Sequence, residues 1–332
     1  MGEKDNATKL YMERNGNFAD AFNYYVFDGV EFIIPDELVS VDTSSVIFPE
    51  AIGKNSESLK RYRDILKCLI IKKDKNASYI LLGIENQSYI DYSMPIRAML
   101  YDAIQYAKQV DDIAEANKQT SKDNAEKSSG EFLSKIKKGD KVCPVITLVI
   151  NFSQTQWDGP ISLRDMTILP DERFLKFMPE YKLNLIDPFS IADRDFNKFH
   201  TELKQLFSFL KYSKNKEKMQ ELVSNNKAFE QVSNDTVGMI NILTGSKIKI
   251  NEQKEETNMC LAIQQMQEDS YLLGQKSGEQ LGLQRGEQLG IENLINTLYE
   301  LGIPNNTIAS KLQEKYNMSY QDSQDAISKY LH

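Results

Sequence analysis

Two carboxylates and an amide on consecutive strand-like segments are the residues of this chain best placed for chemistry. Glu85 follows an unbroken apolar run, Gln87 stands two positions further on, and Asp64 lies on the segment just upstream. If residues 62–71 and 78–87 form a hairpin, Asp64 faces Glu85, and directly opposed side chains lie about 4.5–5.5 Å apart at Cβ. Gln87 then projects from the same face as Glu85, because strand side chains alternate. The spacing therefore predicts that three polar groups converge on one spot.

This convergence has two interpretations. Hard cations such as Mg²⁺ bind carboxylate oxygens and keep several waters, so Asp64, Glu85 and substrate phosphate oxygens would make a suitable coordination shell. An ion bound there would activate water and offset charge during phosphodiester hydrolysis. In the other interpretation, both carboxylates are solvated charges at a sheet edge or beside a turn. Register matters here, because a turn displaced by one residue from residues 74–75 would move Asp64 to the opposite face.

Four short motifs follow one another along the chain. They are Asn17-Phe-Ala-Asp-Ala-Phe-Asn23, Arg63-Asp64, Ile84-Glu-Asn-Gln-Ser88 and Met99-Leu-Tyr-Asp-Ala-Ile-Gln-Tyr-Ala107. Their order resembles the PD-(D/E)XK nuclease family transposases, also called Rpn-type recombination-promoting nucleases. The resemblance covers most of residues 1–270, and the glycine-rich segment that follows is also similar to tails in that family.

The resemblance implies an α/β fold with a restriction-endonuclease-like mixed sheet flanked by helices, and a helical C-terminal extension here completes the expected architecture. It also implies Mg²⁺-dependent DNA cleavage, with Mn²⁺ as a substitute ion, in a bacterial cytoplasm. Asp64 matches the family's metal aspartate and Glu85 its second carboxylate. Gln87 stands where the broader superfamily has lysine, a departure that is usual among the recombination-promoting relatives and removes one cation from the site.

Four further residues are candidates for assisting roles. Asp20 falls in the first turn of a helix expected to begin near Asn17, where the helix dipole also favours a negative charge. Arg97, Tyr101 and Gln105 form a stripe at near-helical steps on a helix expected over residues 95–110. Superfamily relatives use such a helix to line the site, so the stripe is expected either to meet the phosphate backbone or to be an ordinary solvated face.

Composition excludes several other kinds of site. The three cysteines, Cys68, Cys143 and Cys260, have no paired spacing, which argues against a zinc knuckle or a disulfide framework. The chain has two histidines, His200 and His332, which argues against a histidine-based triad or metal cluster. No apolar run approaches the roughly 18 residues that span a bilayer, and no signal peptide is expected. A soluble cytoplasmic protein fits these features.

The chain is expected to have three parts. Residues 1–270 form the nuclease-like core, in which residues 111–141 are a polar flexible excursion. Residues 271–292 form a helical repeat, and residues 293–332 form a small helical tail. In the repeat, glycine recurs every four residues, at Gly274, Gly278, Gly282, Gly286 and Gly290. Because each interior glycine costs a helix about 1 kcal/mol relative to alanine, the repeat either pairs with the same helix of a second protomer or serves as a flexible spacer.

Two functions follow from these features. The first is a Mg²⁺-dependent DNA endonuclease related to recombination and transposition, in which Asp64 and Glu85 hold the ion, Gln87 orients water or a phosphate oxygen, and the tail joins protomers. The second is a catalytically decayed relative that acts as an oligomerising DNA- or protein-binding module. The net charge of −8 favours the second, because proteins that bind the nucleic-acid backbone rely on Lys and Arg. The retained carboxylates favour the first.

Overall fold

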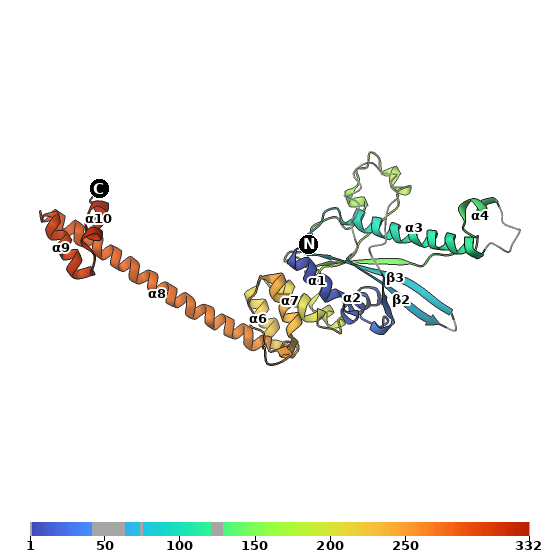
Figure 1. Ribbon diagram of the computed structural model, residues 1–332, viewed down its shortest axis with the longest axis horizontal. Coiled ribbons are helices and arrows are strands. Elements are labelled where there is room, and N and C mark those ends of the chain that lie inside the picture. Colours follow the sequence, from blue (N-terminus) through green and yellow to red (C-terminus); the bar gives the residue numbers. More distant parts are fainter. Residues whose placement is uncertain (1, 42–63, 74–75, 121–128, 332) are drawn as a thin grey trace. The chain divides into compact units, whose positions relative to one another are not determined.

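The computed structural model describes residues 2–41, 64–73, 76–120 and 129–331 (Figure 1). The chain divides into two compact units, Met1–Ala262 and Ile263–His332. A five-stranded sheet with helices on both faces forms the centre of the first unit, and the described part of the second unit is helical.

The central sheet is mixed, with its strands in the order β1-β2-β3-β4-β5. The strands are β1 (Leu38–Ser40), β2 (Ile65–Lys73), β3 (Asn76–Gln87), β4 (Val145–Asn151) and β5 (Asn184–Ile186). β1, β2 and β3 pair antiparallel, whereas β3, β4 and β5 pair parallel. A mixed sheet flanked by helices, with a helical C-terminal extension, confirms the predicted restriction-endonuclease-like fold class.

The hairpin formed by β2 and β3 has the predicted register. Ile65 pairs with Ile84, and Lys73 pairs with Asn76. Residues 74–75, where the turn was predicted, lie outside the described residues. Extended by one position, this register sets Asp64 opposite Glu85.

One face of the sheet is covered by α3 (Met94–Thr120) (Figure 1). Met94 and Ala98 of this helix pack with Val149 of β4, Trp157 and Leu183 in a buried cluster. Because Glu85 pairs with Val149, its side chain also points toward α3.

The opposite face carries the helices α1 (Glu3–Glu13), α2 (Asn15–Phe27), α5 (Leu203–Tyr212) and α7 (Asn234–Thr244). Its core is aromatic: Phe152 lies 5.7 Å from Phe207 of α5, measured between ring centroids. β4 is therefore covered on both faces, which suits a largely apolar strand without polar alternation.

α3 is longer than expected. The predicted helix over residues 95–110 continues to Thr120, so the prediction of a flexible excursion was wrong for residues 111–120. Asn117 explains the continuation, because its buried side-chain amide donates to the backbone oxygen of Lys135 at 3.1 Å and to Asp140 Oδ2 at 2.7 Å. The segment after the helix is thus fixed to its last turns.

The remaining short elements of the first unit surround the sheet. They are η1 (Pro35–Glu37), α4 (Ser129–Ser134), η4 (Arg164–Met166), η5 (Glu172–Lys176), η6 (Asp193–Lys198), α6 (Lys216–Asn225), η7 (Lys227–Phe229), β6 (Val232–Ser233) and β7 (Glu256–Thr257). β6 and β7 form a separate antiparallel pair. None of the described helices is both long and apolar enough to cross a membrane.

The glycine repeat lies on one continuous helix, α8 (Met259–Glu300), which is followed by α9 (Asn305–Tyr316) and α10 (Tyr320–Tyr330). The ends of these three helices share a small core formed by Ile295, Ile308, Ala309, Leu312 and Ile327. The space around Gly274, Gly278, Gly282 and Gly286 is open, since a Cβ added at any of them would meet no atom within 4 Å.

Candidate active site

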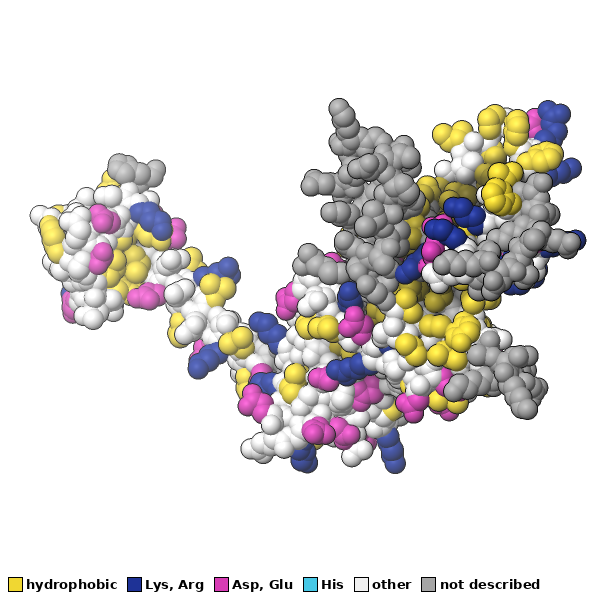
Figure 2. Space-filling view, turned by 45° about the vertical axis from the view of Figure 1, so that its right-hand side comes forward, with side chains coloured by type: hydrophobic (Ala, Val, Ile, Leu, Met, Phe, Trp, Pro, Cys, Tyr) yellow, Lys and Arg dark blue, Asp and Glu magenta, His cyan; other side chains and the backbone are white. Residues whose placement is uncertain are grey.

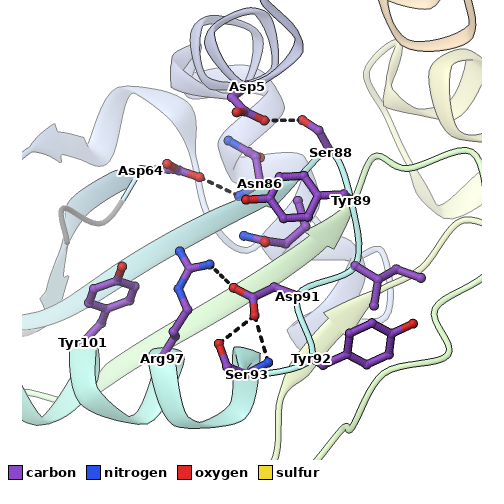
Figure 3. Close-up of a pocket in the computed structure, with 12 residues that line it drawn as sticks. Asp5, Asp64, Asn86, Ser88, Tyr89, Asp91, Tyr92, Ser93, Arg97 and Tyr101 are labelled. Atoms are coloured by element: carbon purple, nitrogen blue, oxygen red, sulfur yellow. Dashed lines mark hydrogen bonds and ion pairs between the residues drawn. The ribbon is translucent and has the colours of Figure 1, made fainter. Parts of the chain in front are cut away.

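A pocket of about 770 Å³ lies where β2 begins and β3 ends, beside the first turns of α1 and α3 (Figure 3). Because β2 starts at Ile65 whereas β3 continues to Gln87, the last residues of β3 contribute to the pocket from both sides of the strand. The lining residues are Asp5, Asp64, Asn86, Gln87, Ser88, Tyr89, Ile90, Asp91, Tyr92, Ser93, Arg97 and Tyr101.

Asp64 and the end of β3 are joined by two hydrogen bonds from backbone N–H groups. The N–H of Asn86 donates to Asp64 Oδ2 at 2.9 Å, and the N–H of Asp64 donates to Glu85 Oε1 at 3.4 Å. Glu85 is fully buried, whereas Asp64 lines the pocket. The predicted pair of carboxylates is therefore brought together, and Gln87, which is 5% exposed, lines the same pocket.

Arg97 joins this pair from the first turns of α3. Its Nη2 lies 3.7 Å from Glu85 Oε2, and its Nη1 forms an ion pair with Asp91. Asp91 is itself fixed, because the backbone N–H and the hydroxyl of Ser93 donate to its Oδ1 at 2.8 and 2.6 Å. Burial lowers the pKa of Arg97, but its hydrogen bonds to Asp91 and Tyr101 and the charge of Glu85 outweigh burial and raise it. The guanidinium is therefore a cation held in a fixed position next to Glu85.

Tyr101 stands one turn further along α3 and lines the pocket. Its pKa is raised, first by burial and then by the charge of Glu85, so the hydroxyl keeps its proton at neutral pH. Gln105, the last residue of the predicted stripe, is buried another turn on and is not among the lining residues.

Asp20 is engaged elsewhere in the fold. Its carboxylate accepts hydrogen bonds from the backbone N–H groups of His200 and Thr201 at 3.0 and 2.8 Å. It therefore ties α2 to the segment before α5, and it is not a lining residue of the pocket.

Two acidic residues of the pocket were not expected from the sequence. Asp5, in the first turn of α1, accepts a hydrogen bond from Ser88 Oγ at 2.5 Å, and Asp91 holds Arg97. Asp5 carried no sequence signal, because only the packing of α1 beside β3 brings it to the pocket. The spacing of Asp91 and Arg97, which fall just before and within the first turns of α3, could have indicated their pairing.

Burial is the main influence on the pKa of Asp64. Burial raises the pKa of Asp64 above its ordinary value, and the hydrogen bond from the Asn86 backbone and the charges of Lys9 and Arg97 offset only part of this effect. The negative charge of Asp5 adds to the increase. A further positive charge near Asp64 would therefore be stabilising.

The residues present fit a divalent ion such as Mg²⁺. Among the described residues, no three His, Cys, Asp or Glu side chains gather closely enough to hold a metal by themselves. Mg²⁺ does not need three, because it commonly binds through one or two carboxylates, several waters and substrate phosphate oxygens. Asp64 and Glu85 supply those two carboxylates.

We expect an Asp64→Asn variant to be more stable than the parent protein at neutral pH in metal-free buffer. The raised pKa means that the folded state holds the Asp64 proton more tightly than the unfolded state does, so this residue's contribution to stability falls as pH rises from its ordinary value of 3.8 through the raised value. Asparagine carries no charge and can still accept the hydrogen bond from Asn86.

Urea denaturation of both proteins between pH 3 and pH 8, with EDTA present, measures this difference. The free energy of unfolding of Asp64→Asn should exceed that of the parent by an amount that grows as pH rises from 3.8 through the raised pKa of Asp64. Above that pKa the difference should level off. Asp112→Asn, on an exposed part of α3, controls for the loss of one carboxylate. An Asp64→Asn variant less stable than the parent at pH 7 contradicts the prediction.

Comparison with known proteins identifies a family for this chain. Residues 30–237 match the family described as "Putative transposase, YhgA-like", a range that is more than half of the chain and contains Asp64, Glu85 and Arg97. Neither the curated proteins nor the solved structures include a significant match to the chain. The resemblance drawn from the short motifs is confirmed at the level of this family, which gives the protein a transposase-related role. The chain belongs to the YhgA-like transposase family.

Proposed function

We propose that this protein is a Mg²⁺-dependent DNA endonuclease that hydrolyses phosphodiester bonds in the PD-(D/E)XK manner. The observation that carries this proposal is the approach of Asp64, which lines the pocket, to the buried Glu85, with the backbone of β3 bonded to the first carboxylate and Arg97 beside the second. Mn²⁺ would replace Mg²⁺, since both accept hard oxygen ligands.

Each side chain of the site has a separate role in the proposed hydrolysis. Asp64 and Glu85 would hold the ion, which when bound activates water and offsets charge on the reacting phosphate. Arg97 lies beside the Glu85 carboxylate and fixes its orientation, and Asp91 in turn fixes Arg97. The Gln87 amide, on the same face of β3 as Glu85, is placed to hydrogen-bond the attacking water or a phosphate oxygen. Where the superfamily has lysine, this amide orients without adding charge.

DNA is the proposed partner and the cytoplasm the proposed location. The family's transposase-related role supports DNA, and three cysteines without disulfides are compatible with a reducing compartment. Recombination-promoting activity would follow from the breaks that the enzyme makes.

Incubation of supercoiled plasmid with the purified full chain and Mg²⁺, Mn²⁺ or EDTA tests the proposal. We expect nicked and linear products with either ion and intact plasmid with EDTA. Intact plasmid under every condition would favour the alternative, a decayed relative that binds DNA or protein, for which the loss of the superfamily lysine at Gln87 is the supporting observation.

We further infer that α8 joins protomers. Its central part is a lone helix with exposed apolar side chains, including Leu273 and Leu283, each 69% exposed, and Figure 2 shows hydrophobic side chains at the surface along it. Glycines every four residues leave room for a second helix to approach closely, and close packing recovers dispersion contacts. That gain offsets the low helix propensity of glycine.

Truncation after Ser270 should therefore lower the oligomeric state and leave the first unit folded. A nuclease with paired sites cuts both strands more readily, so the truncated protein should also shift from linear to nicked plasmid. Light scattering on both proteins at micromolar concentration measures the assembly. A full-length protein that is already monomeric there identifies the repeat as a spacer.

A further inference from the structure

Asn86 has a side-chain amide that makes no hydrogen bond to the residues that the structure describes. The residue is 6% exposed, and within the described residues neither its Oδ1 nor its Nδ2 has a partner. It lines the pocket next to Asp64 and Ser88 (Figure 3). A buried polar group without a partner is costly, and native proteins keep few of them. The amide therefore points to a ligand group that the described part of the protein does not supply.

The chemistry of the amide restricts that ligand. Oδ1 can only accept a hydrogen bond and Nδ2 can only donate, so one ligand that satisfies both must present a donor beside an acceptor. A metal ion would satisfy Oδ1 alone, and a phosphate would satisfy Nδ2 alone. The edge of a nucleobase presents both, and asparagine pairs with adenine through its amino group and an adjacent ring nitrogen.

The surroundings of Asn86 favour a base that carries an amino group. Asp5 and Asp64, two carboxylates that accept hydrogen bonds, line the same pocket, and the negative charge of Asp5 reaches Asp64. They would attract an amino group, which donates hydrogen bonds. Because Asn86 pairs with Ile150 whereas Glu85 pairs with Val149, the amide points away from α3, toward the α1 side of the strand.

Aromatic residues stand at the rim of the pocket. Tyr89 and Tyr92 line it and are 65% and 59% exposed. Tyr92 is positioned by a hydrogen bond from its hydroxyl to Asp158 Oδ1 at 3.1 Å. Exposed aromatic rings stack on nucleobases that have left the duplex, and enzymes that extract a base read its edge by hydrogen bonds.

We propose that this pocket takes up an adenine base next to the scissile phosphate, with Asn86 reading its edge and Tyr89 stacking on it. The proposal rests on the proposed nuclease function and adds a base preference to it. The phosphate reacts on the α3 side of β3, while its neighbouring base docks on the α1 side. The free energy that the unsatisfied amide costs in the free protein would be recovered only when adenine is bound. The amide would therefore discriminate adenine from the other bases.

Selection of bound duplexes from a randomised DNA pool, in EDTA so that nothing is cut, tests the proposal without the chemistry. The parent protein should enrich adenine at one position. Replacing that adenine with the base purine, which lacks the amino group, should weaken binding about five- to hundredfold, as expected for one bidentate pair. Asn86→Leu, which removes both polar atoms, should lose the preference. Asn86→Asp keeps the shape of the side chain and serves where the leucine variant does not fold; it should also lose the preference, because it lacks the donor.

Mapping of cut ends with Mg²⁺ separates the two proposals. Adenine-dependent binding without cleavage overturns the nuclease and leaves base reading intact. Cleavage with no base preference, or a preference that survives both Asn86 variants, overturns base reading and leaves the nuclease intact; it identifies the partner of the amide as a structural water. Failure to bind DNA overturns both. Asn197→Leu, outside the pocket, is the matched control and should keep the parental preference.

Discussion

Glu85→Gln is expected to abolish Mg²⁺-dependent plasmid cleavage, lowering its rate by roughly a hundredfold or more. A metal ion at a phosphoryl group supplies several kcal/mol of transition-state stabilisation, and about 1.4 kcal/mol corresponds to a tenfold change in rate. Glutamine keeps the size of the fully buried side chain and can still accept from the Asp64 backbone at Oε1. It removes the charge that an ion requires.

Initial rates of nicking at saturating Mg²⁺, with circular dichroism to verify folding, measure this effect. Glu115→Gln, in the exposed part of α3, should retain the parental rate. A folded Glu85→Gln protein that nicks as fast as the parent would remove Glu85 from the metal site.

Arg97→Met should destabilise the protein by about 3 kcal/mol, the lower part of the range for breaking a buried ion pair. The Glu85 side chain is 1% exposed and that of Arg97 20%, so loss of the guanidinium leaves a carboxylate in a region that water barely reaches. Methionine fills much of the vacated volume, which limits the effect to electrostatics. The midpoint and slope of urea denaturation give the free energy of unfolding.

A double-mutant cycle distinguishes this cause from the pairing of Arg97 with Asp91. In a Glu85→Gln background the buried charge is absent, so Arg97→Met should cost clearly less than it does alone. An equal cost in both backgrounds would mean that Arg97 stabilises the fold through Asp91 and not through Glu85.

The sequence was most informative where a local pattern carried the geometry. A hairpin needs only a turn and two strands, so the register that sets Asp64 opposite Glu85 was predictable from residue spacing. The approach of Arg97 and Tyr101 followed from helical periodicity together with the family resemblance. The hairpin contacts join residues that are close in sequence, and the helix beside the site is an arrangement common to the superfamily.

Contacts between distant segments were not predictable. Asp5 reaches the pocket because α1 packs beside β3, a consequence of the whole core. Asp20 is bound by residues 200 and 201, which are far along the chain. The extension of α3 to Thr120 depends on buried Asn117, whose partners lie beyond residues 121–128. In each case tertiary structure decided what local sequence could not.

The parallel pairing of β3 with β4 has a consequence for the order of events during synthesis. Asp64, Glu85 and Arg97 leave the ribosome within the first hundred residues, but the strand that lies beside Glu85 spans Val145–Asn151. Pairing across such a separation forms later than a hairpin, because a long loop must close first. A nascent chain shorter than about 150 residues therefore carries the reactive carboxylates on a hairpin with one open edge. Pairing of β3 with β4 would therefore complete the proposed DNA-cutting site only after about half of the first unit has been made.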